Sequence, residues 1–299
     1  MLSVNALDFM NYKNALKGNY RKGVHAFRCI LENPTQAADF AANLGGVCVV
    51  FGVPIGQDDR NSQQLLALLQ ASSVIDQAAL TWLSQWYADY ADDWDTMAGD
   101  AARATAIAGD ALIWRAVGSS PVGAGKVIAT IAGLSCQDYA DMAAVAASST
   151  AMAAVAASQT AMTAVAASQT AMAAVAASQT AMAAVAASKT ALSACRASST
   201  AMAKLAASSI ALTALAASSL VTKYNPTNGN AWTTGTVNGS GIFIKVISYQ
   251  ANNNTVTIDS GSAQSISNNT NYAKAFQSKL AVYYVPYSVS GYGIYYIPC

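Results

Sequence analysis

The hydrophobic pattern is most regular in the middle of the chain, where residues 141–220 form eight consecutive copies of a ten-residue unit. A typical copy reads AMAAVAASQT, with large apolar side chains at its second and fifth positions. Alanine is the strongest helix former, methionine and leucine follow closely, and the copies contain neither glycine nor proline. The pattern predicts one continuous α-helix over residues 141–220, roughly 120 Å long at 1.5 Å per residue.

The stripe of methionine and valine requires a partner, because a lone exposed helix cannot bury it. A ten-residue step falls about 80° short of whole helical turns, so the stripe drifts round the helix and its partners would wind tightly and left-handed. We therefore expect a long Ala-rich coiled-coil shaft in a homo-oligomeric bundle, whose number of strands the pattern does not fix. Its oligomer core is predicted to contain Met152, Val155, Met162, Val165, Met172, Val175, Met182 and Val185.

The same eighty residues allow two other structures. The alternative shaft is a β-solenoid in which one or two copies build one coil. The recurring Ser, Thr and Val residues suit its strands, but the copies lack the residues that form turns. Residues 142–188 carry no charge, but they contain too much Ser, Gln and Thr for an apolar run that crosses a membrane. We expect no membrane span.

Residues 1–140 are predicted to form a separate, mostly helical domain. Residues 62–83 have apolar side chains at helical spacing, and an aromatic stripe of Trp82, Trp86, Tyr90 and Trp94 is expected to pack as core. Residues 40–53 end in a β-branched apolar run that predicts one buried strand. The first residues lack the unbroken apolar stretch of a signal peptide, so we expect synthesis in the cytoplasm.

Two patterns in this domain resemble binding motifs but fail in detail. Asp89, Asp92, Asp93 and Asp100 lack the glycine and glutamate of a calcium-binding EF-hand loop, and they are interpreted as a solvated helix face. Residues 118–127, GSSPVGAGKV, end like a phosphate-binding loop, but a serine stands at the first glycine position and a valine replaces the magnesium-binding hydroxyl. We interpret them as a glycine-rich turn, and expect no metal and no cofactor.

Residues 221–299 are predicted to form a small antiparallel β domain. Turn signals such as Asn-Pro and Asn-Gly separate short strand-like runs at residues 241–248, 255–258, 280–285 and 292–297.

Aromatic side chains are concentrated in this last region, which holds nine of the 14 tyrosines. Tyrosine combined with Ser, Gly and Asn makes adaptable recognition surfaces. The candidate receptor-binding residues are Tyr287, Tyr292, Tyr295, Tyr296 and Trp232. Packing of these tyrosines between subunits is the alternative.

Acids, histidine and cysteine are too sparse for familiar catalysis. Asp259 is the only acid after Asp141, Glu32 is the only glutamate and His25 the only histidine, so neither a carboxylate pair nor a triad can form in the β domain. Five separated cysteines are predicted to be buried free thiols, with Cys195 replacing a core valine. Residues 1–141 have a net charge of −5 (nine basic, fourteen acidic) and the rest +6 (seven basic, one acidic), a mild asymmetry that does not suggest a nucleic-acid surface. We expect no enzyme.

The repeated unit AVAASxTAM is similar to the repeat of bacteriophage tail-fibre proteins. The resemblance covers residues 141–220 closely and the layout of the chain loosely. It implies a trimeric virion appendage, assembled in the host cytoplasm. Residues 1–140 would then attach to other virion proteins, residues 141–220 would form the shaft, and residues 221–299 would face a host cell-surface glycan or protein. The alternative is a purely structural neck, collar or head fibre.

Overall fold

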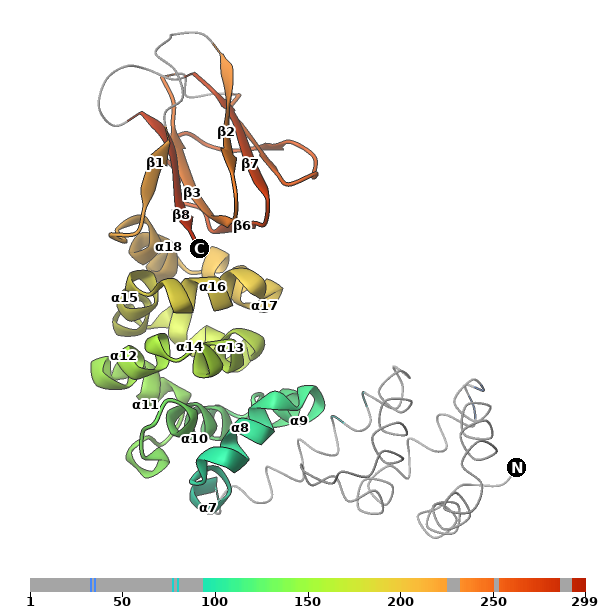
Figure 1. Ribbon diagram of the computed structural model, residues 1–299, viewed down its shortest axis with the longest axis vertical. Coiled ribbons are helices and arrows are strands. Elements are labelled where there is room, and N and C mark those ends of the chain that lie inside the picture. The colour runs from blue at the N-terminus through green and yellow to red at the C-terminus, as the bar shows by residue number, and fades with distance from the viewer. Residues whose placement is uncertain are drawn as a thin grey trace.

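The computed structural model describes residues 33, 35, 77, 80, 94–224, 232–249, 253–285 and 292–299. The strand predicted at residues 40–53, the helix predicted at 62–83 apart from Gln77 and Leu80, and most of the aromatic and acidic residues before Trp94 lie outside the described residues. From Trp94 onward, the described residues form a column of short helices with a β-sandwich at one end (Figure 1).

The repeat array is helical, but the prediction of one continuous helix is wrong. Each copy contributes a separate short helix, and the chain turns sharply between one helix and the next. Neither a coiled coil nor a β-solenoid is present in residues 142–216. The helices are α11 (Met142–Ala147), α12 (Ser149–Ala157), α13 (Gln159–Ala167), α14 (Gln169–Ala177), α15 (Gln179–Ala187), α16 (Lys189–Ala197), α17 (Ser199–Ala207) and α18 (Ser209–Ala216).

A serine at the eighth position of the copies separates these helices. At Ser168 the backbone is extended (φ −95°, ψ 122°), the N–H donates to the last carbonyls of α13, and the side chain accepts from Ala171 N at the start of α14. One residue thus ends a helix and caps the next. Serine competes with the helix in this way because its hydroxyl can bond the neighbouring backbone.

Three helices complete one turn of the column. Successive helices are bent by 101°, 100° and 96° at three of the breaks, so the fourth helix returns to a position beside the first. Helix α12 packs on α15, α13 on α16, α14 on α17 and α15 on α18. The array is therefore an α-solenoid, in which each unit buries its apolar face against its neighbours.

The serine hydroxyls also join one turn of the solenoid to the next. Five of them donate to the carbonyl oxygen of an alanine 32 residues earlier, at 2.5–2.6 Å. The donors and acceptors are Ser178 and Ala146, Ser188 and Ala156, Ser198 and Ala166, Ser208 and Ala176, and Ser218 and Ala186.

The predicted oligomer core is buried inside a single chain. Within a copy the first, second, fifth and sixth residues (Ala, Met, Val and Ala) point into the solenoid, and the third and seventh alanines face outward. The eight predicted side chains are all 0% exposed without a partner chain: Met152, Val155, Met162, Val165, Met172, Val175, Met182 and Val185. Because the single chain covers its own stripe of methionine and valine, the array needs no partner chains to bury that stripe. Cys195 is also fully buried, as predicted.

Helices before the array close its first turns. They are α7 (Trp94–Ala98), α8 (Ala101–Gly109), α9 (Ala111–Val117) and α10 (Pro121–Ile131), followed by the 3-10 helix η2 (Cys136–Asp138). Trp114 Nε1 donates to Ala164 O at 2.9 Å, and Ser168 Oγ donates to Gly118 O at 2.6 Å. Trp94 is buried, as predicted for the aromatic stripe.

The interpretation of residues 118–127 as a glycine-rich turn is wrong, because most of them form α10. Ser120 caps this helix and Pro121 begins it. Gly125 allows close packing on the first copy, since a Cβ there would lie 2.3 Å from the carbonyl carbon of Asp141. The Lys126 ammonium forms a salt bridge with the Asp95 carboxylate at 2.6 Å. The lysine of the phosphate-loop-like pattern is therefore already paired within the chain.

In the described part of the C-terminal region, eight strands form an antiparallel sandwich. One sheet has the order β1-β8-β3-β6 and the other has the order β2-β7-β4-β5. The first strand therefore pairs with the last, β2 with β7, β3 with β6 and β4 with β5, which is the jelly-roll arrangement. The strands are β1 (Thr222–Tyr224), β2 (Thr233–Asn238), β3 (Gly241–Ile247), β4 (Thr255–Ile258), β5 (Gln264–Ser265), β6 (Lys274–Phe276), β7 (Lys279–Tyr284) and β8 (Gly293–Pro298). The four predicted strands are confirmed as β3, β4, β7 and β8.

The sandwich and the solenoid share a hydrophobic core. Ile242, Ile244 and Ile297 belong to the same buried cluster as the array residues Leu205 and Leu215. A side-chain hydrogen bond from Arg196 of α16 to Gln277, in the β6–β7 turn, adds a polar contact. The β domain is therefore fixed to the last helices rather than loosely tethered to them.

Candidate functional site

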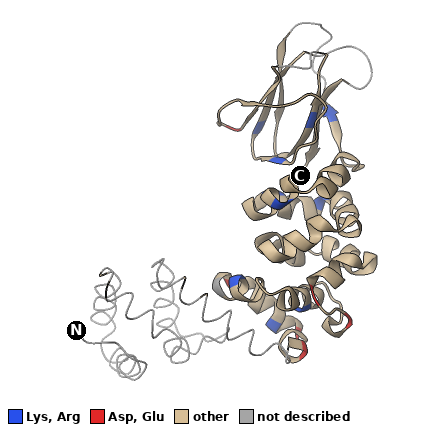
Figure 2. Cartoon of the chain, turned by 180° about the vertical axis from the view of Figure 1, so that it is seen from behind, with Lys and Arg blue, Asp and Glu red and all other residues tan. Residues whose placement is uncertain are grey.

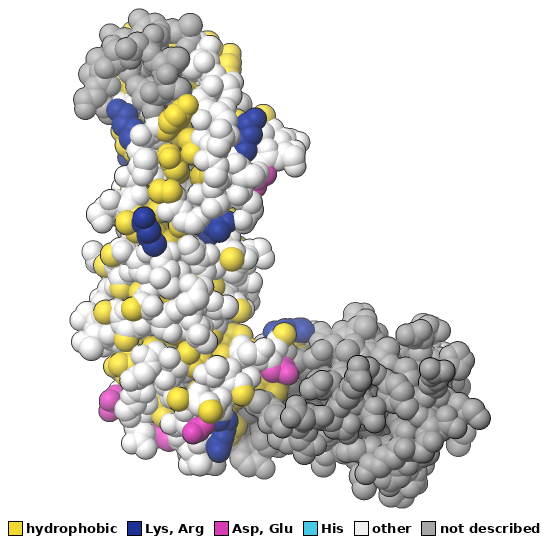
Figure 3. Space-filling model, in the orientation of Figure 1, with side chains coloured by type: hydrophobic (Ala, Val, Ile, Leu, Met, Phe, Trp, Pro, Cys, Tyr) yellow, Lys and Arg dark blue, Asp and Glu magenta, His cyan; other side chains and the backbone are white. Residues whose placement is uncertain are grey.

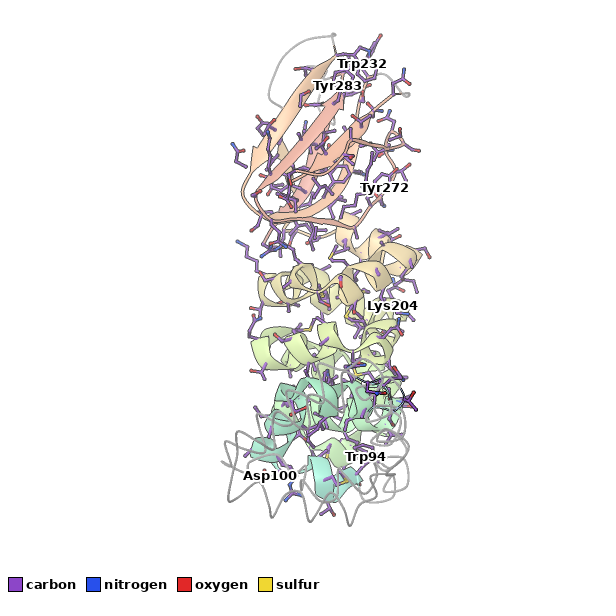
Figure 4. All side chains as sticks on the ribbon, turned by 90° about the vertical axis from the view of Figure 1, so that its right-hand side faces the viewer. Trp94, Asp100, Lys204, Trp232, Tyr272 and Tyr283 are labelled. Carbon is purple, nitrogen blue, oxygen red and sulfur yellow. The ribbon has the colours of Figure 1, made fainter. Side chains whose placement is uncertain are left out.

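The end of the sandwich away from the helices carries a stacked aromatic pair. Trp232, just before β2, stacks on Tyr283 of β7 with 4.9 Å between ring centroids and 19° between planes. The pair lies at the far end of the sandwich from the solenoid (Figure 4). Tyr283 is 40% exposed and Tyr249, just after β3, is 53% exposed, so aromatic surface is available to a partner at this end.

Hydroxyl groups surround the aromatic pair on the outer face of the second sheet. Thr234 and Thr255 lie directly opposite Tyr283 on its two neighbouring strands, and Thr236 and Thr257 flank Ala281 in the same way. Residues opposite each other share a face of the sheet, so these four threonines form two rows beside the stacked rings. Aromatic rings with neutral hydroxyl neighbours suit an uncharged polar ligand such as a sugar.

A buried serine organises the strand ends beneath this surface. Ser248 is 3% exposed, and its Oγ accepts from Val285 N at 3.0 Å, which links β3 to the end of β7. Its backbone exchanges two hydrogen bonds with the side chain of Asn268, at 2.8 and 3.0 Å. The strands that carry Tyr249 and Tyr283 are therefore held together from inside.

The structure separates the sequence-predicted receptor residues. Trp232 is in the aromatic pair, Tyr292 immediately precedes β8, and Tyr287 lies outside the described residues. Tyr296 faces the sandwich interior and packs edge-on against Phe276 at 6.0 Å, so its role in the described chain is packing. Tyr295 points to the opposite face of the first sheet, where the Lys245 ammonium lies 5.5 Å from its ring centroid.

Sequence reasoning missed Tyr283. In β7, whose sequence is KLAVYY, buried and exposed residues alternate and place Tyr283 on the outer face of the sheet. Its stacking on Trp232 joins residues 51 positions apart, which a local pattern cannot indicate. Only the pairing of β7 with β2 brings the two rings together.

Acidic side chains are nearly absent from the array and the sandwich (Figure 2). Asp259, the single acid after Asp141, accepts hydrogen bonds from Ser278 N at 2.8 Å, Lys279 N at 3.0 Å and Gln277 N at 3.1 Å. These backbone bonds, led by those from Ser278 and Lys279, lower the pKa of Asp259 to about 2. Its carboxylate thus holds the β6–β7 turn and does not serve as a general acid.

Cys195 and Cys299 lie near each other at the junction with the helices, where Arg196 interacts with Cys299. Burial, and secondarily the neighbouring Cys299, raise the pKa of Cys195 to about 12. Burial also raises the pKa of Cys299, and Arg196 partly opposes this by its charge and a hydrogen bond. Thiols that stay protonated are poor nucleophiles, so this pair does not form a reactive centre at neutral pH.

The described ranges offer little for other kinds of site. No group of three His, Cys, Asp or Glu residues could hold a metal ion there. In those ranges no single helix is both long and apolar enough to cross a membrane. A groove of about 660 Å³ runs between α15 and α18, lined by uncharged residues that include Gln179, Ile210 and Thr213.

Comparisons with known proteins add no family. Neither protein-family models nor curated protein sequences match this chain. The fold and its surfaces therefore carry the functional argument alone.

Proposed function

We propose that this chain is a structural component of a bacteriophage virion, of the tail-fibre type, that presents its C-terminal sandwich for attachment to a host cell surface. The stacked, solvent-accessible pair of Trp232 and Tyr283 at the free end of the sandwich carries this proposal. Residues 1–140 would attach to other virion proteins, and the ligand would be a host glycan or surface protein. Assembly would take place in the host cytoplasm.

The arrangement of the column supports a presenting role. A solenoid with internal hydrogen bonds and a core shared with the sandwich supports the sandwich rigidly and holds it away from helices α7–α10. A jelly roll hosts many functions, so the fold by itself does not select attachment. Attachment is favoured by the aromatic and hydroxyl groups exposed at the free end. No catalytic role is proposed.

A homotrimer stays a prediction without support from the shaft. The array buries its own apolar stripe, so three chains would have to associate through other surfaces. If they do, three weak sites would act together and raise the overall avidity.

A direct test uses the full chain, labelled with a fluorophore, and cells of the bacterium that supports the phage. We expect saturable binding to these cells, and a loss of at least tenfold in affinity when Trp232→Ala and Tyr283→Ala are combined. Ala153→Ser with Ala173→Ser, on the outer face of the solenoid, is the matched control and should bind like the wild type. Immunogold electron microscopy of virions should also label an appendage, and unlabelled particles would contradict the proposal.

The second candidate function is a purely structural neck, collar or head fibre. The length of the array favours it: eight helices at three per turn, with layers about 8–10 Å apart, give a column of roughly 25 Å rather than 120 Å. Labelled virions combined with no cell binding would select this alternative.

A further inference from the structure

The outer face of the first sheet carries a row of two lysines and a tyrosine. Lys223 of β1 and Lys245 of β3 both lie directly opposite Tyr295 of β8, one on each side. Because paired residues share a face and strands are about 4.8 Å apart, the two lysine backbones are roughly 10 Å apart with the ring between them. On the face of the molecule shown in Figure 3, the sandwich surface carries scattered basic side chains beside a strip of hydrophobic side chains.

A glycine makes room for the first lysine. Gly293 adopts φ +141°, and a Cβ at this position would lie 3.0 Å from Lys223 Cε and 3.3 Å from Lys223 Cγ. The aliphatic part of Lys223 therefore lies across β8 at Gly293, two residues from Tyr295. On the other side, the Lys245 ammonium lies 5.5 Å from the centre of the Tyr295 ring, within the range of a cation–π contact.

The charges around this row are unbalanced. From residue 142 onward the chain has seven basic residues and one acid, Asp259, whose carboxylate is engaged by the β6–β7 turn. Lys223 is exposed and Lys245 is half-buried, so both ammonium groups remain close to solvent. Among the described residues, neither lysine forms a salt bridge, and an anionic ligand would complement them.

We propose that the row Lys223–Tyr295–Lys245 binds an acidic polysaccharide, with the ammonium groups on carboxylates of the polymer and the tyrosine ring against a sugar between them. This inference rests on the proposed attachment function, for which it names a ligand class and a second contact surface. The row lies on the opposite sheet from Trp232 and Tyr283, so the two surfaces can be tested separately.

The binding experiment uses the full chain and polygalacturonate, with fully methyl-esterified polygalacturonate of the same length as the uncharged probe. By biolayer interferometry in 50 mM salt we expect binding to the acid form and at least tenfold weaker binding to the ester. The double variant Lys223→Gln, Lys245→Gln should bind the acid form at least tenfold more weakly, and its affinity should depend less on salt. Tyr295→Phe, which keeps the ring, should retain binding.

The matched control is Lys189→Gln with Lys204→Gln, which removes the same charge from the helices. We expect less than a twofold change in affinity, and unchanged thermal midpoints in all variants. An equal loss in both double variants would overturn the proposal, because the attraction would then be nonspecific. Absence of binding to the acid form, equal binding to the ester, or tighter row-dependent binding to polyphosphate would also overturn it.

Cell binding distinguishes failure of this inference from failure of the proposed function. If the labelled wild type binds host cells and the Lys223→Gln, Lys245→Gln variant binds them equally well, the inference fails and the attachment function stands. If the wild type binds polygalacturonate through the row but binds no host cells, the attachment function fails and the polysaccharide site stands.

Discussion

At the scale of single residues, the serine at the eighth position determines how the array folds. From Ser148 to Ser208 its ψ lies between 115° and 122°, far from the helical range, and its side chain caps the following helix. Its hydroxyl also donates to an alanine carbonyl in the turn below. One side chain therefore supplies a helix end, a helix start and a contact between turns.

Ser188→Ala tests these combined roles. Loss of the cap costs about 1 kcal/mol, and the Ala156 carbonyl left without its partner adds about 1–2 kcal/mol, so we expect a total loss of roughly 2–3 kcal/mol in the free energy of unfolding. Urea denaturation followed by circular dichroism measures it. Ser199→Ala, at an exposed position, should change stability by less than about 0.5 kcal/mol. Similar losses in both variants would contradict the assigned role.

Asp259 gives a pH dependence with a defined sign. Its folded-state pKa of about 2 lies below the ordinary value of about 3.9, so its contribution to stability is fully present above pH ~4 and is lost as pH falls through 2. Asp259→Asn, which tolerates the local φ of +52°, should lower the stability of the sandwich at pH 7. It should also weaken the dependence of the urea midpoint on pH between 4 and 2. A variant with the wild-type pH profile would show that the carboxylate does not hold the turn.

At the scale of elements, the helices of the array are too short to be stable alone. Helices of nine residues are marginal in water, so their stability comes from packing on helices three copies away. Because the copies have nearly the same sequence, we expect any one of them to pack in the position of its neighbour.

Deletion of residues 169–178 tests this equivalence. The deletion removes one whole copy and leaves a serine before the next helix, so we expect a folded protein with its sandwich intact. Deletion of residues 169–173 leaves a helix of about four residues and should cause a large loss of helical circular dichroism and of the thermal midpoint. If the two deletions behave alike, the ten-residue unit is not the folding unit.

At the scale of the whole molecule, one chain buries the core that the coiled-coil hypothesis assigned to three. We expect the thermal midpoint to stay constant over a hundredfold dilution, because unfolding would then be independent of association. Differential scanning fluorimetry at several concentrations measures this. A midpoint that falls on dilution would instead indicate that folding depends on oligomerisation, as the homotrimer prediction requires.

The sequence by itself determined the regular helical repeat, four of the strands and the burial of Met172, Val175 and Cys195, because these depend on residue type and local spacing. It did not determine the path of the array. Helix propensity favours continuing through Ser168, and only contacts with residues about 30 to 50 positions away stabilise the break. The tertiary structure likewise decided the jelly-roll pairing, the stacking of Trp232 on Tyr283 and the row around Tyr295. Strand partners distant in the chain create these surfaces, and a periodic pattern records which face a residue occupies but not which residue lies opposite it.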